Sequence, residues 1–203
     1  MGILSKLFSS GKKAEVLKPG PEVKDLPPSA ARDILIRIYN GPTKEDECIA
    51  YGIAMLPASA NWSQAEKAFL YYIIGESMGN RCSQDQRRIP FFAASVLNNP
   101  IRTNLAWHEI YRIPELKEYP SVSTENAVKL CRQYPLPDSF DSLLQLPDGA
   151  EKKPSVFDTW DEAGKKKFFS HQGQLLNDMR SAGFISPEQH KQLLEDLRVK
   201  LAL

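Results

Sequence analysis

The most apolar tract in the chain predicts a helix that is buried on several sides. It covers residues 64–78 and follows Ser63, which with Glu66 has the spacing of an N-terminal capping box. At about 100° per residue, its apolar side chains fall on two faces of the helix instead of one stripe. The first face holds Ala65, Phe69, Tyr72 and Ile73, and the second holds Leu70, Ile74 and Met78. Gly79 suits a left-handed C-terminal cap.

Shorter helical segments are predicted on both sides of this tract, each bounded by a capping residue or a proline. They are 30–39 after Ser29, a helix from Thr43 that stops before Pro57, 90–97, a short helix containing 105–111 after Thr103, a helix from Ser123 to about Tyr134, and a small helix at 140–146. Only seven valines occur, and no run alternates between apolar and polar residues. Little or no sheet is therefore expected.

The C-terminal segment predicts a helical hairpin. Thr159 and Glu162 have the spacing of a capping box for a long helix that Gly183 closes. Ser186, followed by proline and by a glutamine at the boxing position, begins a last helix that runs to about Leu201. Both helices carry an apolar stripe, and a tight turn between two such stripes brings them together.

These segments predict an all-α protein in four parts. Residues 1–28 form a flexible N-terminal arm and a proline-rich linker, and residues 29–146 form a helical core domain around helix 64–78. An acidic connector with prolines covers residues 147–158, and the helical hairpin covers residues 159–203.

Composition narrows the classes of function. With 26 basic and 25 acidic residues, the net charge of +1 lacks the positive excess that sequence-independent nucleic-acid binding needs. The longest apolar run, 68–74, is far shorter than the roughly 20 residues that span a bilayer. Three cysteines without a C-x-x-C pair, at positions 48, 82 and 131, predict reduced, buried thiols in a cytoplasmic protein.

The tract also contains a possible catalytic motif. Gly75-Glu76-Ser77-Met78-Gly79 has the G-x-S-x-G spelling of a nucleophile elbow, which would make the chain a serine hydrolase. Asp141, Asp148 or Asp158 could then supply the acid and His171 or His190 the base; the combination Ser77, Asp158 and His171 is the one we select.

The context of this motif favours a helix instead. An α/β-hydrolase needs several strands before the elbow, whereas residues 1–62 predict a linker and two helices. Within a helix, Glu76 would lie on a largely apolar face near the C-terminus, where a carboxylate is disfavoured by the helix dipole. Arg81, Arg87 or Arg88 could supply an ion-pair partner, and the alternative is a site carboxylate with a raised pKa.

The sequence predicts no metal and no cofactor. His108-Glu109 is not followed by the second histidine of a zinc-peptidase helix, and His171 and His190 lie on or beside the stripes of the hairpin. Phosphate-binding, dinucleotide-binding, kinase and EF-hand patterns are also missing from the sequence.

The favoured interpretation is therefore a non-catalytic protein-interaction protein: an adaptor, an assembly subunit, or an inhibitor or immunity-type binder of a cognate protein. Its expected partner is another protein and no nucleic acid, with weak membrane contact through residues 1–13 as a further candidate. The partner-binding candidates are Leu4, Leu7, Phe8, Trp107, Tyr111, Phe168 and Phe169.

Overall fold

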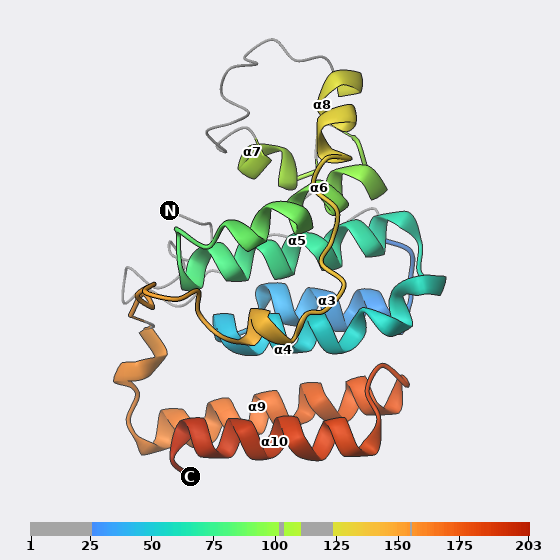
Figure 1. Ribbon diagram of the computed structural model, residues 1–203. Coiled ribbons are helices and arrows are strands. Elements are labelled where there is room, and N and C mark those ends of the chain that lie inside the picture. Colours follow the sequence, from blue (N-terminus) through green and yellow to red (C-terminus); the bar gives the residue numbers. More distant parts are fainter. Residues whose placement is uncertain (1–25, 102–103, 111–123, 155) are drawn as a thin grey trace.

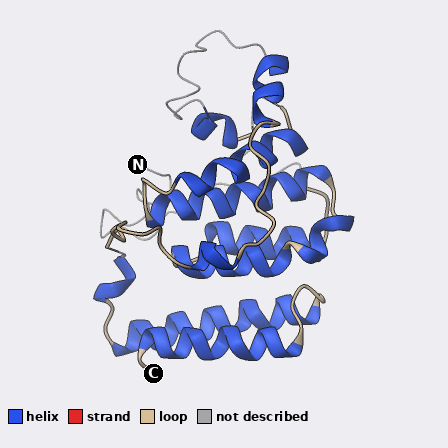
Figure 2. Cartoon of the chain, viewed as in Figure 1, coloured by secondary structure: helices blue, strands red, loops and turns tan. Residues whose placement is uncertain are grey.

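The computed structural model describes residues 26–101, 104–110, 124–154 and 156–203, and within these residues it contains helices and no strand (Figures 1 and 2). The all-α prediction is confirmed. Among the same residues, no helix combines the length and the apolar character needed to cross a bilayer. All three cysteines are buried and unpaired, as their spacing predicted.

Helix α5 (Gln64–Arg81) is the longest helix of the core, and its N-terminus has the predicted capping box. The Ser63 hydroxyl accepts a hydrogen bond from the Glu66 amide, while the Glu66 carboxylate accepts one from the Ser63 amide. The same carboxylate accepts a hydrogen bond from Ser29, the N-cap of α3 (Ala30–Asn40). One side chain therefore fixes the starts of two helices relative to each other.

The predicted end of α5 at Gly79 is wrong. The helix continues to Arg81 and ends at Cys82, whose amide donates to the Met78 carbonyl. The Arg88 side chain lies over Gly79, where an added Cβ would approach its Nη1 to 2.8 Å. The glycine thus serves a close side-chain approach within the helix and not a turn.

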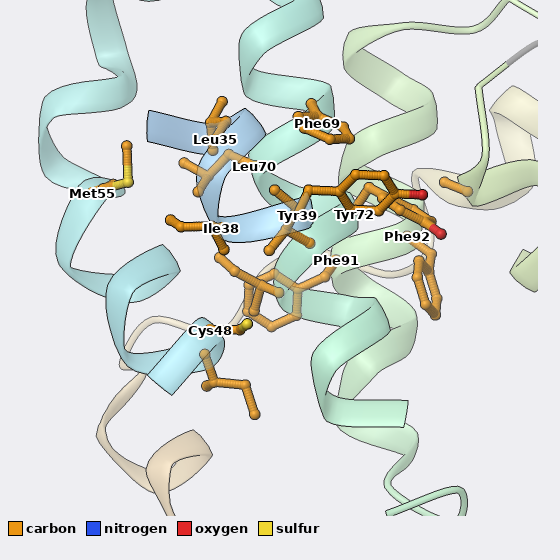
Figure 3. Packing of buried hydrophobic residues seen from close by; sticks show 14 of the residues in the cluster. Leu35, Ile38, Tyr39, Cys48, Met55, Phe69, Leu70, Tyr72, Phe91 and Phe92 are labelled. Atoms are coloured by element: carbon orange, nitrogen blue, oxygen red, sulfur yellow. The ribbon is translucent and has the colours of Figure 1, made fainter. Parts of the chain in front are cut away.

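Helices α3, α4 (Glu45–Met55) and α6 (Ile89–Asn98) surround α5 (Figure 1). Figure 3 shows the aromatic and aliphatic side chains that fill the space between them. Tyr39 of α3 meets Phe69 of α5 edge to face, with ring centroids 5.2 Å apart. On the α6 side, Tyr72 and Phe92 pack with centroids 6.2 Å apart. The two apolar faces predicted for α5 are buried, apart from the partly buried Ala65 at its start.

The remaining helices extend this core. They are α7 (Ala106–Ile110), α8 (Thr124–Cys131), α9 (Glu162–Ser181) and α10 (Pro187–Leu201). Short 3-10 turns lie at Pro57–Asn61 (η1), Gln86–Arg88 (η2), Asp141–Leu144 (η4) and Val156–Thr159 (η5). The small helix predicted at 140–146 is the 3-10 turn η4, and the helix predicted to end near Tyr134 ends at Cys131.

Two predicted helix starts are wrong, and in each case a tertiary contact explains the difference. Helix α4 begins at Glu45 and not at Thr43, because the Thr43 hydroxyl accepts a hydrogen bond from Gln172 of α9. Helix α9 is capped by Asp161 and not by Thr159, which lies in the turn η5. This turn packs Phe157 against α9.

Helices α9 and α10 form the predicted hairpin (Figure 1). Gly183 adopts the left-handed φ of +75° at the turn, and Ser186 forms the predicted capping box at the start of α10. Leu175, Leu176 and Met179 of α9 belong to the same apolar cluster as the core of α5. An ion pair between Arg37 of α3 and Asp178 of α9 lies at the edge of this contact.

The close approach of α4 to α5 generates a test of this packing. A Cβ on Gly52 of α4 would lie 2.4 Å from Ile74 Cγ1 of α5, so Gly52→Ala forces the two helices apart. We expect the free energy of unfolding to fall by about 1–3 kcal/mol in urea denaturation followed by far-UV circular dichroism.

Gly173→Ala on α9 is the matched control. An added Cβ there meets nothing nearer than Leu194 Cδ2 at 3.8 Å, an ordinary contact. Since alanine favours a helix over glycine by about 1 kcal/mol, this variant should be as stable as wild type or more stable. Equal unfolding midpoints for Gly52→Ala and wild type would contradict the packing described above.

Candidate functional site

Ser77 does not lie in a nucleophile elbow. It occupies the interior of helix α5, is 1% exposed, and lies beside the thiol of Cys48 on α4. Burial raises the pKa of this thiol well above its ordinary value. No strand precedes Ser77 in the described part of the chain, so the elbow interpretation of residues 75–79 is wrong in geometry.

The proposed triad is not assembled by the described residues. His171 lies at the contact between α9 and α3, where burial and the charge of Arg37 lower the pKa of its imidazole. Ser77 instead lies beside Cys48, which belongs to a different helix, α4. His190 pairs with Asn177 Oδ1 at 3.0 Å and thereby joins α10 to α9. The side chain of Asp158 lies outside the described part of the structure.

Glu76 lies on a buried face of helix α5, as predicted, and is 6% exposed. Asn80 Nδ2, one turn later, lies 3.4 Å from its Oε1. The carboxylate that Arg81 and Arg87 share is Asp85, which the sequence did not single out. Asp85 is fully buried and also caps the turn η2 by accepting from the Arg87 amide.

The two arginines tie residues 142–145 to the end of α5. Arg87 grips Asp85 with Nε and Nη2 at 2.8 and 2.7 Å, and its Nη1 donates to the Ser142 carbonyl. Arg81, 2% exposed, donates to the carbonyls of residues 143 and 145 and lies 3.4 Å from Asp46 of α4. A buried guanidinium thus connects α4, α5 and the chain after α8.

The partner-binding candidates fall in different environments. Trp107 is 3% exposed and donates through Nε1 to the Ile101 carbonyl, while Phe168 is 1% exposed and packs against Trp160. Both side chains therefore belong to the interior. Phe169 is only partly buried. Leu4, Leu7, Phe8 and Tyr111 lie outside the described residues.

Phe169 lines a groove on the hairpin with a volume of about 510 Å³, which we call the hairpin groove. Its other lining residues are Gly173, Asn177, His190, Lys191, Leu194, Glu195 and Arg198. Because residues 169, 173 and 177 are four apart, they lie on one face of α9. The absence of a side chain at position 173 leaves space between Phe169 and Leu194.

The hairpin groove has an apolar centre and a charged edge. The guanidinium of Arg198 lies over the Phe169 ring, 5.9 Å from its centroid, and 3.9 Å from the Glu195 carboxylate. Sequence periodicity indicated the apolar stripes but not the groove. The sequence signal for the groove was Gly173 inside a predicted helix, with the aromatic residue Phe169 four positions earlier.

The described residues contain no group of three or more histidine, cysteine or acidic side chains placed to hold a metal ion. Comparisons of the chain with protein-family models, with curated proteins and with solved structures give no match. The function is therefore argued from the geometry of this chain alone.

The arginine network predicts a pH-dependent stability. Burial alone would raise the pKa of Asp85, but hydrogen bonds from Arg87 and the charges of Arg87 and Arg81 lower it below its ordinary value. A carboxyl group with a lowered pKa stabilises the fold above its unfolded pKa of about 4, and this stability is lost as pH falls through the folded pKa.

We therefore expect Asp85→Asn to lower the free energy of unfolding by about 3 kcal/mol at neutral pH, because it leaves buried Arg81 with one carboxylate fewer. Below pH about 4 the difference from wild type should shrink, because Asp85 becomes protonated first in the unfolded chain and, at still lower pH, in the folded protein as well. Urea denaturation across this pH range measures both effects. Asp138→Asn, at an exposed carboxylate, is the control. If Asp85→Asn lowers the free energy of unfolding by the same amount at every pH, the stabilising role of the ionised Asp85 carboxylate is contradicted.

Proposed function

We propose that the protein is a non-catalytic interaction protein that binds a partner protein through the hairpin groove. The observation that carries this proposal is the space over Gly173 between Phe169 and Leu194. An apolar centre within a polar rim is the usual anatomy of a protein interface. The edge of the groove carries the charged side chains of Lys191, Glu195 and Arg198.

The expected occupant is an amphipathic helix of the partner that inserts an apolar side chain over Gly173. Helices recognised in this way present apolar anchors on one face and charges beside them. An acidic residue next to the anchor would pair with Lys191, which is exposed at the edge of the groove. An adaptor, an assembly subunit and an inhibitor of a cognate protein could each use this mode of binding.

Two further observations support the proposal. The one candidate nucleophile that the sequence offered, Ser77, is buried inside α5, which removes the reason for a hydrolase. The buried, unpaired cysteines support a cytoplasmic location, where thiols stay reduced. Contact of residues 1–13 with a partner or a membrane stays a prediction.

The test compares two leucine substitutions on α9. Gly173→Leu fills the groove, whereas Ser170→Leu adds the same side chain at an exposed position outside the groove lining. Partners captured from cells of the source organism are identified by mass spectrometry, and circular dichroism confirms that both variants fold.

We expect wild type and Ser170→Leu to retain the same partner, and Gly173→Leu to lose at least about tenfold in its recovery, because the anchor can no longer enter. If Gly173→Leu retains the partner, the groove is not the binding site. If all three proteins are recovered alone, the interaction function itself is contradicted.

A further inference from the structure

A second hollow lies on the other side of α10, between this helix, α4 and the turn η4. It has a volume of about 390 Å³ and is called the α4–α10 cavity below. Its lining residues are Asp46, Glu47, Ala50, Tyr51, Leu144, Leu193, Asp196, Leu197, Val199 and Lys200. The hairpin groove uses different residues of α10, so the two sites are separate.

Two buried polar atoms in the lining have no hydrogen-bond partner. They are Glu47 Oε2 and the Tyr51 hydroxyl, on side chains that are 4% and 1% exposed. The two residues are four apart on α4 and therefore share one face of the helix. A buried polar atom without a partner is costly, so a pair of them on residues that line one cavity favours a ligand that supplies the missing bonds.

The charges around the cavity define the ligand's polar group. Three carboxylates line it, those of Asp46, Glu47 and Asp196, against the single cation Lys200. Lys200 Nζ lies 3.3 Å from Glu47 Oε1, which leaves the second oxygen of this carboxylate for another donor. Asp46 is already paired with Lys152, at 2.6 Å, and with Arg81, at 3.4 Å.

The hydrogen-bonding groups of Glu47 and Tyr51 restrict the chemical class of the ligand further. A carboxylate oxygen accepts hydrogen bonds and donates none, whereas a phenolic hydroxyl can do either. A ligand that satisfies Glu47 and Tyr51 together must therefore donate. A primary ammonium does so with three N–H groups, and a charged donor forms a stronger hydrogen bond to a carboxylate oxygen than a neutral donor does.

The walls define the rest of the ligand. Five apolar side chains line the cavity, and two of them lie at an exposed rim: Leu144, 52% exposed, and Val199, 70% exposed. The arginine network fixes the rim, since Arg81 and Arg87 bind the carbonyls on both sides of Leu144. An apolar wall of this kind suits an organic cation better than a hydrated inorganic ion.

We propose that the α4–α10 cavity is a binding site for a small amphipathic amine, with its ammonium group on Glu47 and Tyr51 and its apolar body between α10 and Leu144. This site goes beyond the interaction function proposed above and does not depend on it. A ligand of this class would join α4 to α10 and thereby hold the hairpin against the core.

The probe is n-hexylamine, which is an ammonium ion at neutral pH, and hexan-1-ol and hexanoate are matched neutral and anionic controls. Isothermal titration calorimetry on the full chain measures binding. We expect saturable binding of hexylamine, with hexanol and hexanoate weaker by about tenfold or more, since neither supplies a charged donor.

Three variants locate the site. Glu47→Gln removes the charge, Tyr51→Phe removes the hydroxyl, and Ala50→Leu fills part of the cavity. Each should weaken hexylamine binding, with Glu47→Gln losing about tenfold. Glu195→Gln, at an exposed carboxylate of α10 outside this cavity, should bind as wild type does.

Two results would overturn the proposal. One is the absence of saturable hexylamine binding to wild type. The other is binding that Glu47→Gln and Ala50→Leu leave unchanged while circular dichroism shows both variants folded, because the amine would then bind elsewhere.

Discussion

The structure depends on the burial of both apolar faces of α5. A helix with two apolar faces cannot lie at a surface, so α3, α4 and α6 must all pack against it. The contact with α4 is close enough that Gly52 has no room for a side chain beside Ile74. Glu66 adds a polar constraint, because its carboxylate serves the capping box of α5 and also accepts from the N-cap of α3. Packing and capping therefore fix the same arrangement.

The buried helix also determines where chemistry can occur. Ser77 is enclosed in the interior of α5. The polar groups that we connect with stability and ligand binding lie elsewhere: Asp85 and its arginines at the end of α5, and Glu47 and Tyr51 on α4. At the end of α5, Arg81 binds the backbone after α8 and brings Leu144 to the rim of the α4–α10 cavity. Hairpin α9–α10 closes that cavity and carries the hairpin groove on another face. The α4–α10 cavity thus arises from how the hairpin lies on the core (Figure 1), whereas the hairpin groove forms within the hairpin itself.

The sequence predicted correctly the helix caps and turns that depend on a few neighbouring residues. The capping boxes at Ser63 and Ser186 and the turn at Gly183 follow from a few neighbouring residues, and each was found in the sequence. Positions decided by tertiary contacts were missed. Thr43 looked like a helix cap, but its hydroxyl bonds to α9, and Gly79 looked like a helix end, but an arginine packs over it. The α4–α10 cavity could not be predicted, because it needs the packing of helices distant in sequence. The hairpin groove lies between two consecutive helices, but apolar stripes alone do not show where space remains between them.

Native-state hydrogen exchange on the amides of α5 tests the central claim most directly. If α5 is the interior helix on which the others depend, its amides exchange only through global unfolding, with an exchange free energy equal to that of unfolding by urea. Amides on the exposed side of α10 should exchange through smaller openings. Exchange of the α5 amides at the rate of α10, while α3 and α4 stay protected, would contradict the account.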